Sequence, residues 1–426
     1  MAGKGVPLSS TKRRRLLSRL GPGLVTGAAD DDPSGIGTHS QIGAQFGYAL
    51  GWTFVLSFPL LAVIQLVAAE IGRVTGRGIA ANLRRHYPRP LLWLAVTLLL
   101  IANVINLGAD LSAMGASLQL LIGGSIGLYT LLFGLFCAGL ETFLSYRRYA
   151  SVLKWTTLSL FAYLGVVAVA GVDWPVALRS FVVPEIHWTS VYLTALVAIL
   201  GTTISPYLFF WQAAQEIEEE KRTHAKPLYV APEKAGQVLK DIRDDTLVGM
   251  GFSTIISIAI VFATAATLHK SGITTINSAA EAAEALRPVA GSLASFLFAA
   301  GIIGTGLLAV PVLAGSAAYA TTEMVGLAGS LDAKPWRARF FYGVIVVTTL
   351  VGALFQKLGF NPIQALYWTA VINGILAVPL MVLMMMIVRN PLAMGTLILP
   401  PRLAAIGWAA TAVMAAATLL FFVSLF

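Results

Sequence analysis

Apolar residues occur along this chain in long runs separated by short polar segments. The runs are about 20 residues or longer and show no alternation of apolar and polar positions, so each predicts a membrane-spanning helix rather than a strand. The pattern predicts about eleven spans after a polar, basic tail over residues 1–20. The predicted spans cover residues 21–47, 49–71, 91–121, 126–143, 152–172, 191–215, 246–268, 292–324, 340–355, 362–388 and 404–426.

The first and sixth spans are each interrupted by polar residues next to a proline. Three aspartates at 30–32 precede Pro33, and the polar residues Thr202, Thr203 and Ser205 precede Pro206. Proline disfavours helix at the residue before it, so both spans are expected to unwind there. The breaks lie five spans apart, and an odd repeat length inverts the second copy in the membrane. Corresponding broken helices in two inverted halves are typical of a transporter's binding site.

This repeat defines the expected domain organisation. We expect an all-α polytopic membrane protein with an inverted repeat of spans 1–5 and 6–10. The cytoplasmic tail is 1–20 and the transmembrane domain 21–426, which divides into a first repeat (21–172), a second repeat (191–388) and an additional helix (404–426).

Composition and charge support this class. Hydrophobic residues make up 57% of the chain and charged residues 12%, whereas soluble chains carry about 25% charged residues. The single cysteine, Cys137, excludes an intrachain disulfide and a thiolate metal cluster. The net charge of +9 comes from basic residues in short loops between spans. That distribution reports topology rather than a nucleic-acid partner.

The basic loops also predict orientation and location. Residues 73–89, 147–154, 334–339 and 389–402 carry the Lys and Arg of these loops, together with the tail. Cytoplasmic loops are enriched in these residues, so we expect the N-terminus inside, and about eleven spans then place the C-terminus outside. We expect a multi-pass monomer in the plasma or inner membrane, with the lipid bilayer as its surroundings.

The aspartates at 30–32 are the leading candidates for ion ligands. An ionisable residue at bilayer depth costs at least about 2.5–3.5 kcal/mol and marks a functional site. Carboxylates beside unwound carbonyls suit a hard cation. The alternative is a polar loop before the first span. A channel would require a shared pore-lining repeat and an enzyme would require a nucleophile with a base; neither pattern is visible, so we expect a transporter rather than an enzyme.

Specific residues resemble a known family. Gly21–Pro22–Gly23 followed by Asp32–Pro33 resembles the first helix of the Nramp divalent-metal transporters, whose motif is Asp-Pro-Gly-Asn. Residues 67–76 resemble the end of that family's second helix, and residues 205–208 lie where it has Met-Pro-His-Asn in helix six. The resemblance implies the LeuT-type fold, with helices 1 and 6 broken, and alternating access around a mid-membrane metal that is substrate rather than cofactor.

The chain departs from the family pattern where the metal would bind. Asp32 keeps the metal-binding aspartate, but Gly35 stands in place of the motif's asparagine and Ser205 in place of its methionine. Without the soft sulfur the surroundings are all oxygen, which suits Mg²⁺, Mn²⁺ or Ca²⁺. Small side chains enlarge the cavity for an ion such as Mg²⁺ that retains several waters. The pattern resembles the Nramp-related magnesium-transporter branch.

A second group of departures concerns protons. Tyr207 and Gln212 fall where the family places histidines linked to proton movement, and Ala113 stands where a glutamate is usual. Asp110 matches a family acid. We therefore expect import of Mg²⁺, and also Mn²⁺, by a secondary transporter or facilitator without proton coupling. The alternatives are a proton-coupled Mn²⁺ or transition-metal transporter and a cation channel.

The expected site residues form two groups. The expected metal ligands are Asp32, Asp31, Thr202, Ser205 and Gly35. The expected neighbours of these ligands, or parts of the ion path, are Asp30, Ser34, Tyr207, Gln212, Asp110 and Asn373.

Several of these polar residues have a structural alternative. Hydroxyl or carbonyl groups of Thr202, Thr203 and Ser205 either bind the ion, with the Thr202 carbonyl as the first candidate, or satisfy the backbone at the break. Asn103, Asn106 and Asp110 share one helical face, and packing between helices is favoured over an ion path. Asn373 either reaches the site through water or makes a structural hydrogen bond. The acidic run 216–220 is interpreted as a solvated cytoplasmic face.

Overall fold

The computed structural model describes residues 22–143 and 156–425, and these residues are helical or irregular, with no strand among them. The tail 1–20 and the basic loop 147–154 after the fourth predicted span lie outside the described residues. The helices that cross the bundle are α2 (Pro22–Asp30), α3 (Pro33–Phe46), α4 (Trp52–Thr75), α6 (Arg89–Ile122), α7 (Ile126–Phe143), α9 (Phe161–Val169), α11 (Ser190–Thr203), α12 (Pro206–Arg222), α13 (Ala235–Thr267), α16 (Ala294–Val325), α17 (Arg339–Leu354), α18 (Pro362–Val388) and α20 (Pro401–Val423).

Shorter helices connect them. These are α5 (Ile79–His86), α10 (Trp174–Val182), α14 (Ala279–Glu284), α15 (Arg287–Ala290) and α19 (Pro391–Met394). Single 3₁₀ turns occur at Thr156–Leu160, Pro232–Lys234, His269–Ser271, Gly291–Leu293 and Phe355–Leu358.

The span prediction agrees with these helices. Nine helices of the described part, with α11 and α12 taken together, are long and apolar enough to cross a membrane, or ten if the bent pair Leu158–Val169 and Trp174–Val182 is one span. The other predicted span is α2 with α3, whose halves are each short because the helix breaks between them. The start of the fifth predicted span falls in 144–155, outside the described residues.

The charged stretch 216–245, which lies between two predicted spans, is mostly helical. α12 continues to Arg222 and α13 begins at Ala235, so only a short connection remains between the two helices. Charge pairs three residues apart, such as Lys221–Glu218, support the exposed end of α12. Hydrophobicity locates the apolar part of a span, but such helices extend beyond it.

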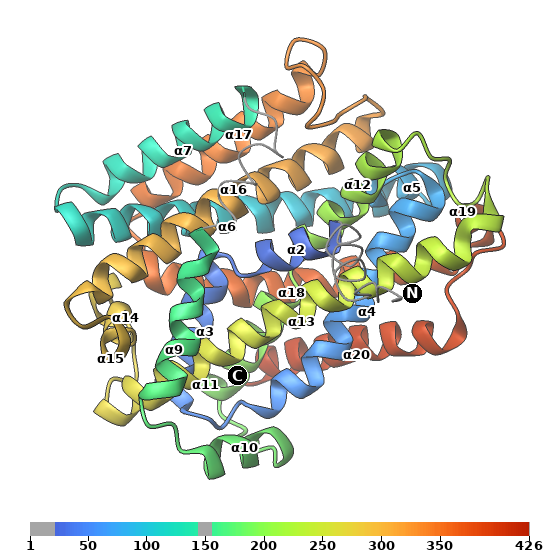
Figure 1. Cartoon of the computed structure of the whole chain (residues 1–426). Coiled ribbons are helices and arrows are strands. Elements are labelled where there is room, and N and C mark those ends of the chain that lie inside the picture. The colour runs from blue at the N-terminus through green and yellow to red at the C-terminus, as the bar shows by residue number, and fades with distance from the viewer. Residues whose placement is uncertain (1–21, 144–155, 426) are drawn as a thin grey trace, which may run out of the picture.

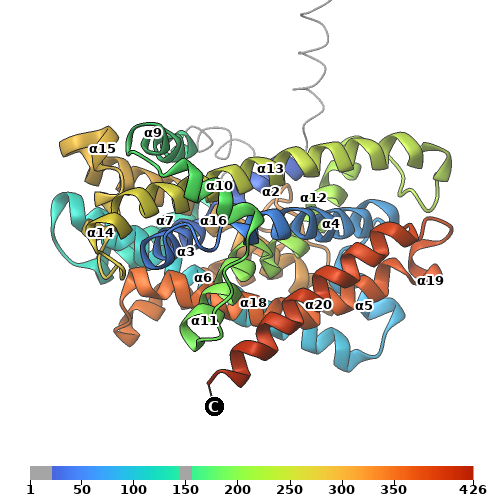
Figure 2. The same ribbon diagram turned by 90° about the horizontal axis from the view of Figure 1, so that it is seen from below.

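The long helices lie side by side in one elongated bundle (Figure 1). α5 and α19 are at one end, called here the α5 end, while α14 and α15 are at the other, called here the α14 end (Figure 1, Figure 2). α6 is central and packs against α7, α16, α17 and α18. α20 starts beside α19 and ends near α11, so the C-terminus lies away from the α5 end (Figure 1).

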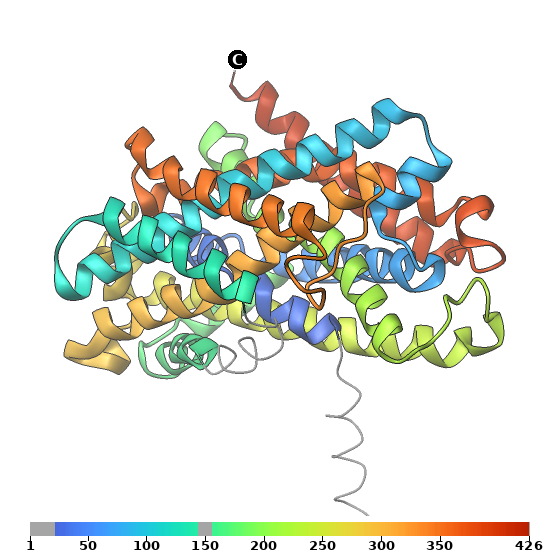
Figure 3. The ribbon, with the colours of Figure 1, turned by 90° about the horizontal axis from the view of Figure 1, so that it is seen from above.

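Small residues bring the two broken helices close to their neighbours. An added Cβ at Gly27 of α2 would lie 2.7 Å from the Cα of Gly249 on α13. At Gly201 of α11 it would lie 2.6 Å from the Cα of Gly374 on α18. Such contacts between backbones are typical of membrane helix interfaces. α2 accordingly lies along α13 in the view from above (Figure 3).

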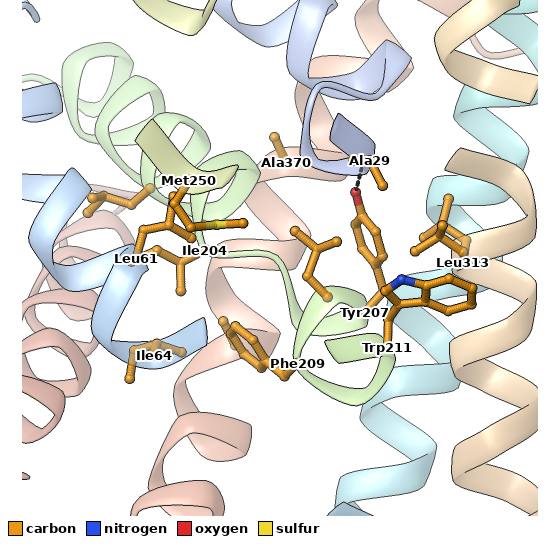
Figure 4. Packing of buried hydrophobic residues seen from close by; sticks show 14 of the residues in the cluster. Ala29, Leu61, Ile64, Ile204, Tyr207, Phe209, Trp211, Met250, Leu313 and Ala370 are labelled. Carbon is orange, nitrogen blue, oxygen red and sulfur yellow. Dashed lines mark hydrogen bonds between the residues drawn. The ribbon is translucent and has the colours of Figure 1, made fainter. Parts of the chain in front are cut away.

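Buried aromatic residues fill the space beside the second break. Tyr207, Phe209 and Trp211 of α12 are almost fully buried, and Trp211 lies beside Leu313 of α16 (Figure 4). The Tyr207 hydroxyl donates a hydrogen bond of 3.0 Å to the carbonyl of Ala29, near the end of α2 (Figure 4). This core therefore holds the two broken helices together at their breaks.

Candidate functional site

The two predicted helix breaks meet inside the bundle. Asp31 and Asp32 separate α2 from α3, and Ile204 and Ser205 separate α11 from α12. A Cβ added at Gly35, in the first turn of α3, would lie 3.6 Å from the Thr202 hydroxyl oxygen. The sequence prediction that both spans unwind at a proline is confirmed, and the structure brings the two breaks together.

Asp32 begins α3 as its N-cap residue. One carboxylate oxygen, Oδ1, accepts hydrogen bonds from the Gly35 amide at 2.6 Å and from the Ser34 hydroxyl at 2.8 Å. Pro33 follows at the first helical position, where its missing N–H leaves no donor unpaired. An aspartate at the N-cap also interacts favourably with the helix dipole. Local sequence therefore fixes the direction of this carboxylate.

The other Asp32 oxygen faces two more helices. Asn106 of α6 donates to Oδ2 at 3.2 Å, and the Tyr207 hydroxyl lies 3.3 Å from the same oxygen. Asn106 also donates to Asp110 at 3.0 Å and accepts from Asn373 of α18 at 2.9 Å. A buried polar network thus runs from Asp32 through α6 to α18.

Asp30 and Asp31 are turned toward a different helix. The Ser253 hydroxyl of α13 lies 2.5 Å from Asp30 Oδ2 and 3.2 Å from Asp31 Oδ1. Ser253 was not among the predicted site residues, because nothing in its local sequence distinguishes it from other hydroxyls in apolar spans. The three consecutive aspartates therefore divide into a pair facing α13 and one that faces α6 and α12.

Buried oxygen atoms without a hydrogen-bond partner gather in these networks. Among the described residues, Asp30 Oδ1, Asp31 Oδ2, Asp110 Oδ1 and Thr202 Oγ1 have no such partner. None of the site carboxylates forms a salt bridge with a described Lys or Arg. Concentrated negative charge with free oxygen lone pairs is chemically suited to a hard cation.

The carboxylates do not form a metal cage by themselves. No group of three His, Cys, Asp or Glu side chains within the described ranges is arranged to hold a metal ion. A cation at Asp32 would therefore use hydroxyl, amide or backbone oxygens, or keep some of its water.

Ser205 satisfies the backbone at the break. Its hydroxyl lies 3.0 Å from the Gly201 carbonyl and 2.9 Å from the Thr202 carbonyl, and it does not cap α12. The Thr202 hydroxyl, in contrast, has no hydrogen-bond partner among the described residues and lies on the side of Gly35. Of the hydroxyls at 202–205, Thr202 is thus the one left free to contact an ion.

Gln212 belongs to a separate cluster toward the α5 end. Its side chain accepts a hydrogen bond from Thr26 of α2 and donates to Glu216 at 3.2 Å. The Gly23 amide donates to Asp245 of α13 at 2.6 Å. These contacts join α2 to α12 and α13, so Gln212 lies apart from Asp32.

The acidic run 216–220 is not uniformly solvated, which corrects the sequence-based interpretation. Glu216 and Glu220 are buried, and Glu220 pairs with Arg73 of α4 at 3.0 Å. Only part of the run follows the expected solvated pattern, because α12 packs against α4 and α16 along its length.

Uncharged amides connect the helices at the α14 end. Gln41 of α3 donates to the Thr274 carbonyl at 3.0 Å and accepts from the Ile276 amide at 2.9 Å. Asn277 accepts from Asn361 at 2.7 Å and from Gln364 at 3.0 Å. Gln364 therefore makes structural hydrogen bonds in this structure. Hydrogen bonds thus hold the broken first span at both ends, and Asp32 is buried between them.

Comparisons with known proteins agree with this arrangement. The family model described as "Natural resistance-associated macrophage protein-like" (Nramp) matches residues 23–424. The chain is 27% identical over 322 residues to a protein of Yersinia pestis named divalent metal cation transporter MntH, a match covering 72% of this chain and 73% of that protein.

Solved structures show the same fold. The manganese transporter of Eremococcus coleocola has a TM-score of 0.74 at 18% identity, covering 98% of this chain and 88% of the other. Mhp1, a nucleobase-cation-symport-1 family transporter, has a TM-score of 0.55 at 16% identity, covering 95% and 92%. The predicted LeuT-type fold, with its two broken helices, is confirmed.

Proposed function

The chain belongs to the Nramp-like family, and on this premise we propose that it carries divalent metal cations into the cell as a secondary transporter or facilitator. The mechanism is alternating access around Asp32, with the metal ion as substrate and no resident cofactor. The relatives' names describe transporters, which supports this role over that of an enzyme.

One observation carries the proposal: a buried carboxylate at the junction of both helix breaks is surrounded by oxygen and amide groups. The side chains that hydrogen-bond Asp32 belong to Ser34, Asn106 and Tyr207, and none of them carries sulfur or imidazole. Hard ligands favour Mg²⁺ and Mn²⁺ over Cd²⁺ or other soft ions. We therefore assign Mg²⁺ as the main substrate, with Mn²⁺ also carried.

The proposed site has Asp32 as its principal ligand and Thr202 as the contact from the second break. Gly35 leaves room for an ion that keeps water, and Ser205 removes the soft ligand from this position. Asp31 acts more weakly, because its carboxylate already meets Ser253. The proposed ion path or surrounding shell consists of Asp30, Ser34, Tyr207, Gln212, Asp110 and Asn373.

Transport is proposed to proceed without proton coupling. Tyr207 and Gln212 do not titrate near neutral pH, and Ala113 cannot titrate at all. Asp110 remains the only acid among the positions compared with the family's proton-linked groups, and one acid does not make a relay. The ion gradient and the membrane voltage then drive uptake.

A second candidate is proton-coupled transport of Mn²⁺. Two relatives favour it: the similar solved structure is that of a manganese transporter, and the Yersinia pestis relative is named as a general divalent metal cation transporter. Mn²⁺ accepts oxygen ligands as Mg²⁺ does, so both ions suit the same residues.

The molecule's placement is part of the proposal. We place the N-terminus and the α5 end in the cytoplasm, with 21–172 and 191–388 as the inverted repeats and 404–426 as the additional helix. The protein acts as a monomer in the plasma or inner membrane. Concentration of Arg at 73–89 near the α5 end supports this orientation.

Uptake into proteoliposomes tests the proposed function. Mg²⁺, Mn²⁺, Ca²⁺ and Cd²⁺ are supplied outside in parallel while a trapped dye reports internal pH. We expect Mg²⁺ uptake, competition by Mn²⁺, poor uptake of Cd²⁺ and no acidification. Acidification during Mn²⁺ or Cd²⁺ uptake, with no measurable Mg²⁺ transport, would establish the second candidate instead.

A further inference from the structure

The Asn106 amide lies between two buried carboxylates. Its Nδ2 is 3.2 Å from Asp32 Oδ2 and 3.0 Å from Asp110 Oδ2, and the residue is fully buried. The amide thus presents its NH₂ group to both carboxylates, which is the orientation that ionised carboxylates, as pure acceptors, require. In this arrangement the amide NH₂ partly offsets the negative charge of the site.

Asn373 fixes this orientation from the opposite side. Its Nδ2 donates to Asn106 Oδ1 at 2.9 Å, and it is buried in α18. An amide has a donor and an acceptor side, so both side chains can turn over together and keep one hydrogen bond between them. After that turn Asn106 would donate to Asn373 and direct its oxygen toward Asp32.

A divalent cation at Asp32 reverses the electrostatic preference. The carboxylates then interact with the cation and need no donor, while an NH₂ group facing the cation is repelled. An amide oxygen is a normal ligand for Ca²⁺ and other hard cations. We propose that Asn106 is a direct ligand of the transported cation through Oδ1, with Asn373 as the residue that holds it in the turned orientation. This inference rests on the proposed function of the Asp32 site.

Asn103 shows what a packing asparagine looks like on the same helix. It lies one turn earlier on α6 and is also buried, but its amide donates to the Leu313 carbonyl at 2.8 Å and the Ser316 hydroxyl at 2.7 Å on α16. The sequence-based preference for packing fits Asn103 in this structure. Asn106 differs because its partners are the site carboxylates.

Gly35 offers a second place for the same chemical group. A Cβ added there would lie 3.4 Å from Asp32 Oδ1 and 3.6 Å from Thr202 Oγ1. Its nearest neighbour would be the Asp30 carbonyl oxygen, at 3.3 Å. A side chain at 35 would therefore extend beside Asp32. An amide introduced there should restore part of the ligand set when Asn106 is lost.

The test compares Asn106→Leu, Asn106→Asp and Asn103→Leu in the purified full chain, by calorimetric titration with Mg²⁺ and Mn²⁺ and by uptake. Leucine keeps the size of asparagine without an oxygen ligand, and aspartate keeps the oxygen but cannot donate when ionised. We expect Asn106→Leu to weaken cation affinity roughly 10–100-fold. We expect Asn106→Asp to bind at least as tightly as wild type, and Asn103→Leu to bind normally. Adding Gly35→Asn to Asn106→Leu should recover affinity.

The outcomes separate the two proposals. Loss of affinity in Asn106→Asp equal to that in Asn106→Leu would overturn the ligand role, because donation to Asp32 and Asp110 would then be what matters. Wild-type affinity in Asn106→Leu would overturn it as well. A wild-type protein that neither binds nor carries a divalent cation refutes the proposed function itself. If Asn106→Leu does not fold, Asn106→Asp decides the question alone.

Discussion

At the residue scale, the Asp32 carboxylate serves the helix with one oxygen and the site with the other. Oδ1 caps α3 through Ser34 and Gly35, while Oδ2 meets Asn106 and Tyr207. The capping hydrogen bonds fix the orientation of the side chain. The second oxygen connects it to α6 and α12 through the Asn106 amide and the Tyr207 hydroxyl. A substitution of Asp32 should therefore lower both stability and transport, and the two losses can be measured independently.

We expect Asp32→Ala to abolish cation uptake while the protein still folds. Loss of an N-cap costs about 0.5–2 kcal/mol, which lowers the melting temperature without preventing folding. Uptake and fluorescence-detected size exclusion measure the two effects on the same preparation. Asp31→Asn and Asp32→Asn form the matched pair, and Asp31→Asn should reduce uptake only mildly. Near-wild-type transport by well-folded Asp32→Ala would contradict the assignment of the principal ligand, and a full loss confined to Asp31→Asn would reverse it.

We expect Ser205→Met to shift selectivity toward soft ions. The serine hydroxyl bonds only to carbonyls at the end of α11, so its loss costs about 0.5–1.5 kcal/mol. A thioether at this break gives Cd²⁺ a ligand that Mg²⁺ cannot use, and its bulk narrows the space for a hydrated ion. Competition of Cd²⁺ against Mg²⁺ uptake measures the shift. Ser205→Ala, which lacks both hydroxyl and sulfur, should leave Cd²⁺ poorly carried; an unchanged preference in Ser205→Met would refute the role of this position.

The residues predictable from sequence are those whose role is local. Asp32, Pro33 and Gly35 lie within one helix turn, and the proline predicts the break without knowledge of distant contacts. Asn106 and Ser253 could not be assigned to the site, since Asn106 is 74 positions from Asp32 and Ser253 is 222 from Asp31. The sequence predicts that Asn103, Asn106 and Asp110 share one face of α6. Only the structure shows that Asn103 contacts α16 whereas Asn106 and Asp110 lie at the site.

At the scale of elements, the first broken span is held by its contact with α13. Gly27 of α2 lies against Gly249 of α13 with room for no side chain between them, and the Gly23 amide is bonded to Asp245. α3 is anchored separately through Gln41 at the α14 end. The two halves of the span can therefore be loosened one at a time.

We expect Gly27→Val to separate α2 from α13 and to destabilise the structure by about 1–3 kcal/mol, the usual cost of overpacking. A Cβ at this position would lie 2.7 Å from the Gly249 Cα, so α2 must shift. Thermal unfolding in detergent and uptake in proteoliposomes measure the result. Gly236→Val is the matched control because a Cβ there has no atom within 4 Å. Equal melting temperatures for the two variants would show that the contact is not tight.

Element boundaries were harder to predict than element order. The order of spans and both breaks follow from apolar runs and prolines, which are local signals. The extension of α12 and α13 beyond the apolar runs is not predicted, because charged residues such as Glu220 and Asp245 are typical of a loop in the sequence. Only the structure shows that Glu220 pairs with Arg73 of α4 and that Asp245 accepts a hydrogen bond from Gly23 of α2.

At the scale of the whole molecule, charge and topology support each other. The Arg-rich residues around α5 lie at one end of the bundle, and the C-terminal end of α20 lies away from it (Figure 1). Basic loops are retained in the cytoplasm, so under the proposed orientation the α5 end lies inside and the C-terminal end of α20 lies on the outer side. The proposed organisation, two inverted five-span repeats plus one helix, also has an odd number of crossings.

We expect single cysteines at Ser9 and Arg85 to react from the cytoplasmic side and cysteines at Ile186 and Leu425 from the outside. The background is Cys137→Ser, which removes a buried thiol. Arg85, Ile186 and Leu425 have exposed side chains, so their reactivity reports membrane side rather than burial. An impermeant maleimide applied to intact cells and then to opened membranes distinguishes the sides. If cysteines at Ser9 and Leu425 label from the same side, the number of spans must be even. If the cysteines at Ser9 and Arg85 both label from outside, the orientation proposed for α2 and the α5 end is reversed.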